Sequence, residues 1–177
     1  MMTFLLTLVS LISSPLLNTS FAQFDSDGFR QALKVKKNLY LSKGSITGGD
    51  RNSSDFSVSN VRVAANPAGY DRFVIDLQGN QLGEKASLAR PPFYLVQVDS
   101  ENKKIIVTLY GKPKLNFSTA IAEKSAQKTK TFHHLDFIPV VTDDRWMFTI
   151  ETVAPNIKAE VFELSEPARI IIDLVKK

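Results

Sequence analysis

The segment AEVFELSEPARIIIDL, residues 159–174, contains the clearest strand pattern in the chain. The apolar runs Ala159 to Leu164 and Ile170 to Val175 flank Ser165-Glu166-Pro167, and these three residue types favour a turn. Three consecutive Ile residues, 170–172, indicate a strand that is covered on at least part of both faces. The segment therefore predicts a β-hairpin within a layered β structure.

Three more hairpins are predicted upstream by the same pattern of two apolar runs around a polar turn. Their runs are Val61 to Val63 with Phe73 to Leu77, Phe93 to Val98 with Ile105 to Tyr110, and Leu135 to Val141 with Trp146 to Thr152. The turns are Asn66-Pro67-Ala68-Gly69, Asp99-Ser100-Glu101-Asn102 and Thr142-Asp143-Asp144. Eight short strands at this spacing are typical of a sandwich or a barrel. Only Ser118 to Lys128 has a helical pattern.

The four hairpins fall into two similar pairs, which indicates an internal repeat. Asp71 to Ile75 aligns with Asp144 to Phe148, and Lys104 to Leu109 aligns with Arg169 to Leu174. The alternative is that any two β-hairpins resemble each other. We predict an all-β fold, a β-sandwich of two similar antiparallel sheets built from an internal repeat, with one short helix.

Arg169 and Asp173 lie on one face of the last predicted strand, because side chains two and four residues apart point the same way. They are too far apart to pair with each other. We therefore expect each of them to form a salt bridge with a neighbouring strand.

The first 22 residues have the layout of a secretory signal peptide. They contain no charged side chain, and the apolar run Phe4 to Leu17 is short for a membrane span. Ser20-Phe21-Ala22 places small residues before a cut after Ala22. An uncleaved N-terminal anchor is the alternative. We predict a signal peptide at 1–22, an N-terminal extension or linker at 23–57 with loop composition from Ser42 to Ser57, and one β domain at 58–177.

Composition favours an exported binding protein over an enzyme. The 177 residues include no Cys and only two His, which leaves few residues for metal binding or for nucleophilic catalysis. The net charge is +4, and its Lys and Arg residues are dispersed, so we expect no nucleic-acid partner. An exported chain without Cys suits a bacterial periplasm. We expect no cofactor, no bound metal, and no membrane association once the signal peptide has been removed.

Two segments resemble the AMIN domain, a family of exported β-domains. VRVAANPAGYDRFVIDL, residues 61–77, is similar to its opening V-R-V strand, short turn and R-V-V-x-D-L strand. AEVFELSEPARIIIDL is similar to its closing motif, with Pro167, Arg169, Asp173 and Leu174 at the family's spacing. The resemblance covers about residues 61–174. It implies a β-sandwich of two similar sheets that targets periplasmic amidases or the secretins of pilus and secretion systems to the cell wall.

Arg62, Tyr70 and Arg72 surround the first predicted turn and are the expected ligand-binding residues. An exposed aromatic ring can stack on a sugar, and Arg can bind a peptide carboxylate with two hydrogen bonds, so the three residues suit peptidoglycan. The alternative is a solvated turn with ordinary surface charges. Trp146, the single Trp, is expected in the core.

Two other functions remain open from the sequence. The chain could be an accessory protein of a pilus or secretion complex in the cell envelope, binding protein rather than glycan through an exposed strand edge. It could also be a small hydrolase with an unrecognised site. Neither is favoured, and His133 and His134 do not suit a metal site, because adjacent strand residues point to opposite faces.

Overall fold

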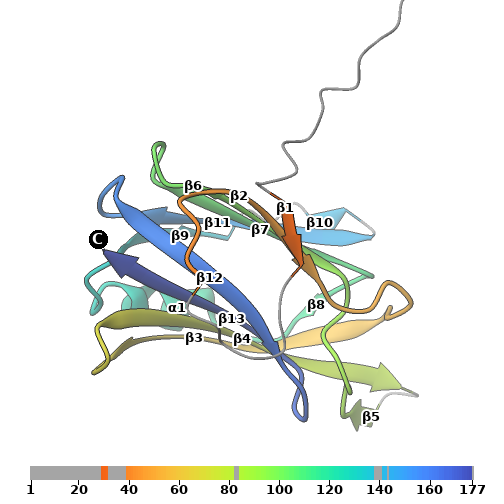
Figure 1. The fold of residues 1–177 in the computed structure, drawn as a ribbon. Coiled ribbons are helices and arrows are strands. Elements are labelled where there is room, and N and C mark those ends of the chain that lie inside the picture. Colours follow the sequence, from red (N-terminus) through yellow and green to blue (C-terminus); the bar gives the residue numbers. More distant parts are fainter. Residues whose placement is uncertain (1–28, 32–38, 82–83, 138–140, 143, 177) are drawn as a thin grey trace, which may run out of the picture.

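The computed structural model describes residues 29–31, 39–81, 84–137, 141–142 and 144–176 (Figure 1). The predicted signal peptide lies outside these residues, as do residues 23–28 and 32–38 of the predicted extension. The described part of the chain forms thirteen strands and one helix. They are β1 (Phe29–Gln31), β2 (Lys43–Gly48), β3 (Phe56–Asn66), β4 (Tyr70–Gln81), β5 (Glu84–Ala86), β6 (Tyr94–Asp99), β7 (Lys104–Tyr110), β8 (Lys114–Leu115), α1 (Thr119–Ala126), β9 (Phe132–Asp136), β10 (Val141–Thr142), β11 (Arg145–Thr152), β12 (Ile157–Leu164) and β13 (Arg169–Lys176).

The strands form two sheets, which Figure 1 shows as two layers. Sheet A has the order β1-β2-β6-β7-β11-β10, and β9 also pairs with β11. Sheet B has the order β12-β13-β4-β3-β8, and β5 also pairs with β4. Within the described strands, only β1–β2 and β3–β8 pair in parallel. The prediction of an all-β fold with two sheets and one short helix is confirmed.

The hydrophobic core lies between the two sheets and is rich in aromatic rings. In β11 the buried residues alternate with half-buried or exposed ones, as a strand with one face on a core requires. Trp146 is fully buried, and its ring centroid lies 4.7 Å from that of Phe148. Phe73 of sheet B lies 5.6 Å from Phe148 of sheet A, so aromatic contacts cross the sandwich. The prediction that Trp146 is a core residue is confirmed.

Helix α1 confirms the predicted helix at Ser118 to Lys128. Ser118 is its N-cap, and the side chain accepts a hydrogen bond from the Ile121 amide at 3.4 Å. Ala122 and Ala126 are buried, and the helix packs against β3 and β9. The side chain of Ile121 lies on the solvent side, where it is 67% exposed.

Three predicted hairpins, β3–β4, β6–β7 and β12–β13, form as expected. The fourth differs, because the expected strand Leu135 to Val141 is divided between β9 and β10, which both pair with β11. β11 pairs with β9 along its C-terminal half and with β10 at its N-terminal end. The predicted third turn therefore joins only the short strand β10 to β11.

The prediction of loop or linker for Ser42 to Ser57 is wrong for two stretches. Lys43–Gly48 is β2, a strand inside sheet A between β1 and β6. Phe56 and Ser57 open β3, so the expected domain start at residue 58 falls within a strand. Ile46 and Leu41 are buried in the common core. Strand β2 pairs through backbone hydrogen bonds, which its polar, glycine-containing composition does not reveal.

Each sheet takes one hairpin from each half of the predicted repeat. Hairpins β3–β4 and β12–β13 lie in sheet B, and hairpin β6–β7 lies in sheet A with β9, β10 and β11. Neither half of the chain therefore forms a sheet by itself. An exact repeat of two hairpins would supply four strands to each sheet, and both sheets contain more than four.

Candidate functional site

The outer face of sheet B carries six polar residues that we call the arginine ladder. Strand alternation selects this face, because Phe73 and Ile75 of β4 point into the core while the residues between and beside them point away. The ladder comprises Arg62 of β3, Tyr70, Arg72 and Asp76 of β4, and Arg169 and Asp173 of β13. The register places Arg72 opposite Asp173, and Asp76 opposite Arg169.

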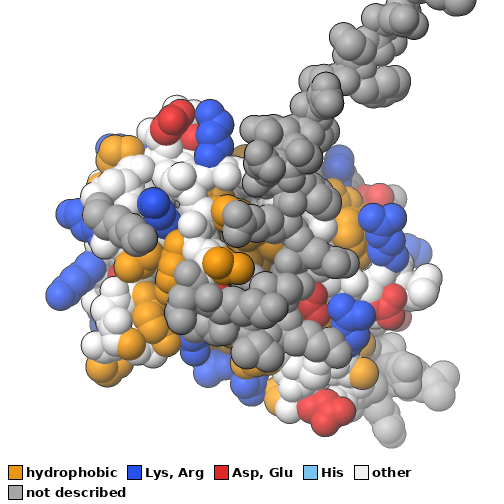
Figure 2. Space-filling model, viewed as in Figure 1, with side chains coloured by type: hydrophobic (Ala, Val, Ile, Leu, Met, Phe, Trp, Pro, Cys, Tyr) orange, Lys and Arg blue, Asp and Glu red, His pale blue; other side chains and the backbone are white. Residues whose placement is uncertain are grey.

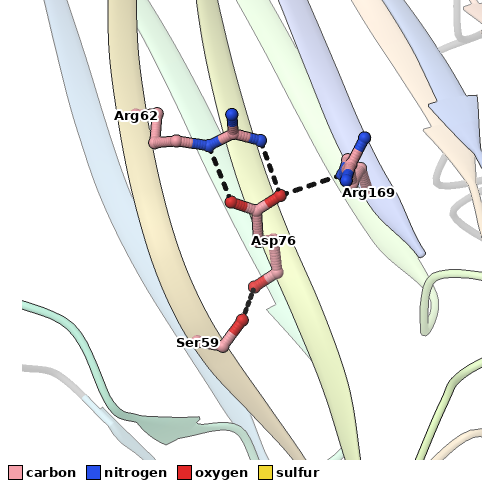
Figure 3. A network of polar contacts seen from close by, with 4 residues as sticks. All are labelled: Ser59, Arg62, Asp76 and Arg169. Carbon is pink, nitrogen blue, oxygen red and sulfur yellow. Dashed lines mark hydrogen bonds and ion pairs between the residues drawn. The ribbon is translucent and has the colours of Figure 1, made fainter. Parts of the chain in front are cut away.

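One end of the ladder is a carboxylate held between two guanidinium groups (Figure 3). Arg62 donates from Nε to Asp76 Oδ2 at 2.8 Å and from Nη2 to Oδ1 at 2.9 Å. Arg169 Nε lies 3.0 Å from Asp76 Oδ1. Ser59 donates its hydroxyl to the Asp76 carbonyl oxygen at 3.2 Å, which ties β3 to β4 at this point. Two cations and one anion leave this end with one excess positive charge.

The other end is a bidentate pair joined to an aromatic ring. Arg72 donates to Asp173 Oδ1 at 2.7 Å and to Oδ2 at 2.9 Å, and the Asp173 side chain is fully buried. Arg72 Nη2 also donates to the Tyr70 hydroxyl at 3.2 Å. Its guanidinium carbon lies 5.1 Å from the Tyr70 ring centroid and 5.5 Å from that of Phe162. The hydrogen bonds to Asp173 raise the pKa of Arg72 above its ordinary value, although burial opposes the rise.

A small apolar cluster separates the two ends of the ladder. Val74, Ile171 and Phe162 come from three adjacent strands of sheet B and pack together, with Leu164 against them. These residues do not belong to the core between the sheets. The predicted coverage of the triple-Ile strand on both faces is confirmed, because Ile170 and Ile172 lie in the core while Ile171 lies in this cluster.

The structure brings together two of the three predicted ligand-binding residues. Tyr70 and Arg72 are in contact, whereas Arg62 lies at the opposite end with Asp76 and Arg169. The expectation that Arg169 and Asp173 pair with a neighbouring strand is confirmed, because both partners lie on β4. The role of Asp76 was not predicted. The repeated Asp-Leu pair, at 76–77 and 173–174, is the signal that could have indicated it.

Two buried carboxylates that the sequence analysis did not single out hold loops rather than extend the ladder. Asp71 accepts hydrogen bonds at 2.8 Å from the amides of Lys130 and Thr131 and from the Thr131 hydroxyl, which fixes the connection between α1 and β9. Glu163, inside the sandwich, accepts from the Gly49 amide at 2.8 Å and lies 3.4 Å from Arg90 Nη2.

The exposed part of the ladder can donate hydrogen bonds to an anionic or hydroxylated ligand. The Arg62 side chain is 51% exposed, and Asp76 occupies only its Nε and one hydrogen of Nη2. The side chains of Arg72 and Arg169 are 31% and 32% exposed. On the face of the molecule that Figure 2 shows, Lys and Arg side chains lie at separate places rather than in one patch.

The described residues contain neither a candidate metal site nor a helix that could span a membrane. There, no group of three or more His, Asp or Glu side chains is placed to hold a metal ion. His134 instead lies 2.9 Å from Glu123 of α1. No helix in the described part of the chain is long and apolar enough to cross a bilayer.

Comparisons with protein-family models, with curated proteins and with solved structures found no match for this chain. The resemblance to the AMIN domain therefore rests on its motifs. Five residues of the two motifs lie in the arginine ladder: Arg62, Arg72, Asp76, Arg169 and Asp173.

Proposed function

We propose that this chain is a non-catalytic periplasmic module that binds peptidoglycan through the arginine ladder. The observation that carries the proposal is the way the ladder's guanidinium groups are held. Asp76 and Asp173 each accept two hydrogen bonds from one arginine, so the arginine planes are fixed on the outer face of sheet B. A ligand then binds donors whose orientation is already set, which lowers the entropy cost of binding.

The donors that remain suit the peptide carboxylates of a cell wall. Arg62 keeps the Nη1 side of its guanidinium for a second bidentate contact, and the neighbouring Arg169 gives this end an excess of positive charge. Tyr70, half-buried beside Arg72, presents an aromatic ring of the kind that packs on the apolar face of a sugar. Carboxylate and sugar occur together in peptidoglycan.

The wider proposal is that the chain is an AMIN-like targeting domain of a bacterium, exported by a signal peptide at residues 1–22.

The duplication that we infer has support in the strand order. The orders β3-β4-β13-β12 and β9-β11-β7-β6 are related by exchanging the two halves. The register is not an exact copy. The alignment equates Arg145 with Arg72 and Thr108 with Asp173, so an exact copy of the Arg72–Asp173 register would place Arg145 opposite Thr108. The strands instead place Arg145 opposite Tyr110, two residues away.

The test is co-sedimentation of the purified protein with isolated peptidoglycan sacculi at low and moderate salt. Arg62→Ala removes the most exposed guanidinium, and Tyr70→Ala removes the ring next to Arg72. The matched control is Lys124→Ala, which removes one positive charge from α1, away from the ladder. We expect both ladder variants to bind about five-fold more weakly and the control to bind as the unmodified protein does.

Two results would contradict the proposal. Equal binding of all three variants would mean that the wall is bound elsewhere or only by general charge attraction, which moderate salt would abolish for every variant alike. Absence of sedimentation at low salt would favour the alternative, an accessory protein of an envelope complex that binds another protein.

A further inference from the structure

A groove of about 640 Å³ lies on the outer face of sheet A, the sheet that does not carry the arginine ladder. Strands β2, β6 and β7 and the turn between β6 and β7 form it. Ser45, Gln97 and Ile106 stand side by side across the three strands in direct register. Their neighbours Ile46, Val96 and Ile105 point into the core, so these three side chains point outward into the groove.

The groove is lined by groups that both donate and accept hydrogen bonds. Gln97 and Asn102 are exposed amides, and Ser45 is a half-buried hydroxyl. Asp99 holds Asn102 in place, because its carboxylate accepts hydrogen bonds from the Asn102 backbone amide at 3.2 Å and from the Asn102 side-chain nitrogen at 2.8 Å. The Asn102 side-chain oxygen therefore has a set orientation. These hydrogen bonds lower the pKa of Asp99, so the carboxylate stays ionised and keeps accepting them.

The charges at the groove balance one another. Lys43 and Lys104 line it together with Asp99, and Lys43 Nζ lies 3.5 Å from the carboxylate of Glu101 in the adjoining turn. Two cations next to two anions give no net attraction for an acidic or a basic ligand. Ile106, half-buried, supplies an apolar surface beside the amides.

We propose that this groove binds a neutral oligosaccharide. A sugar presents hydroxyl groups that donate and accept at once, which matches the amides and the hydroxyl, and its C–H face matches Ile106. This proposal is independent of the arginine ladder, because the two sites lie on opposite sheets. A neutral chain can come from N-acetylated glycan or from an unacetylated glucan, and the two sources share the hydroxyl chemistry.

The test uses titration calorimetry of the protein, produced from the full chain, with chitotetraose, cellotetraose and a galacturonate trimer. We expect one or both neutral tetrasaccharides to bind and the acidic trimer not to bind. Gln97→Ala should weaken that binding about five-fold, because one amide contact is lost. Thr149→Ala is the matched control, since Thr149 lies opposite Ile106 on β11 but does not line the groove.

Binding of chitotetraose alone would assign an N-acetylated glycan, and equal binding of cellotetraose would assign a glycan recognised by its hydroxyl groups. The proposal is overturned if neither neutral sugar binds, if only the galacturonate trimer binds, or if Gln97→Ala and Thr149→Ala bind equally. Calorimetry of Arg62→Ala separates the two sites, because loss of a ladder arginine should leave oligosaccharide binding unchanged.

Discussion

Buried and exposed members of the arginine ladder should differ sharply in their contribution to stability. Asp173 is fully buried and accepts two hydrogen bonds from Arg72. Asp173→Asn keeps a single acceptor oxygen, so one of these hydrogen bonds is lost and the other is no longer assisted by a negative charge. We expect a loss of about 2–3 kcal/mol in the free energy of unfolding, measured by urea denaturation. Arg62→Ala removes a pair in which the arginine is 51% exposed, so its loss should stay below about 1 kcal/mol. Equal losses would contradict this account of the ladder.

Tyr94 should make the protein lose stability in alkaline solution. Its side chain is fully buried in the core, and burial raises the pKa of the hydroxyl above its ordinary value of 10.0, with the Glu163 carboxylate adding to the rise. The folded state therefore keeps the proton after the unfolded state has lost it. The sign follows: the stabilisation is complete below about pH 10 and falls as pH rises further, by at most about 1.4 kcal/mol per pH unit.

The measurement is urea denaturation of the unmodified protein and of Tyr94→Phe between pH 9 and pH 11, values chosen around the ordinary pKa of 10.0. Both proteins share every other titrating group, so the difference between their slopes isolates Tyr94. We expect the unmodified protein to lose stability more steeply. Parallel slopes would mean that Tyr94 titrates alike in the folded and unfolded states.

At the level of single residues, the sequence allowed the type of partner to be predicted but not its identity. Arg169 and Asp173 share a strand face by simple alternation, which was enough to predict salt bridges with a neighbouring strand. That both partners belong to β4 depends on which strands become neighbours. Arg62 and Arg72 were predicted to share one site because they flank one turn. They are separated because Arg62 pairs with Asp76 of β4 and Arg72 pairs with Asp173 of β13.

Strand β2 is the element whose importance is hidden from composition. Because Ile46 of β2 is buried in the common core, Ile46→Ala should lower the free energy of unfolding by about 2–4 kcal/mol. Thr47→Val, on the outer face of the same strand, should change stability by less than about 0.5 kcal/mol. Urea denaturation measures both. A neutral Ile46→Ala would mean that residues 42–57 form the linker that their composition predicts.

The elements that were predicted well are those that local residues specify. Hairpins β3–β4, β6–β7 and β12–β13 each combine apolar runs with a turn of Asn, Asp, Ser, Gly or Pro residues that lies between them. Strand β2 pairs with β6, which lies more than forty residues later in the chain, and has only Ile46 as a large apolar residue. A strand of this kind is stabilised by its neighbours rather than by its own sequence.

At the scale of the whole molecule, the two sheets should fold as one unit. Sheet B needs β3 and β4 from the first half and β12 and β13 from the second, and sheet A likewise combines β6 and β7 with β11. We expect one cooperative transition, with the fluorescence of Trp146 and the far-ultraviolet circular dichroism changing together. A molecule whose halves fold separately would give two transitions.

Division of the chain tests this interdependence directly. A fragment ending at Gly111 contains β3, β4, β6 and β7 but lacks the strands that cover the inner edge of β4 and of β7, namely β13 and β11. Without those strands, β4 and β7 would each expose unpaired backbone groups, and core side chains of the fragment would be exposed to water. We therefore expect the fragment to remain unfolded alone. Mixing it with a fragment from Lys112 onward should restore strand content and a cooperative melt. Cooperative folding of the first fragment by itself would show that one half of the chain is a stable unit and would contradict this interdependence.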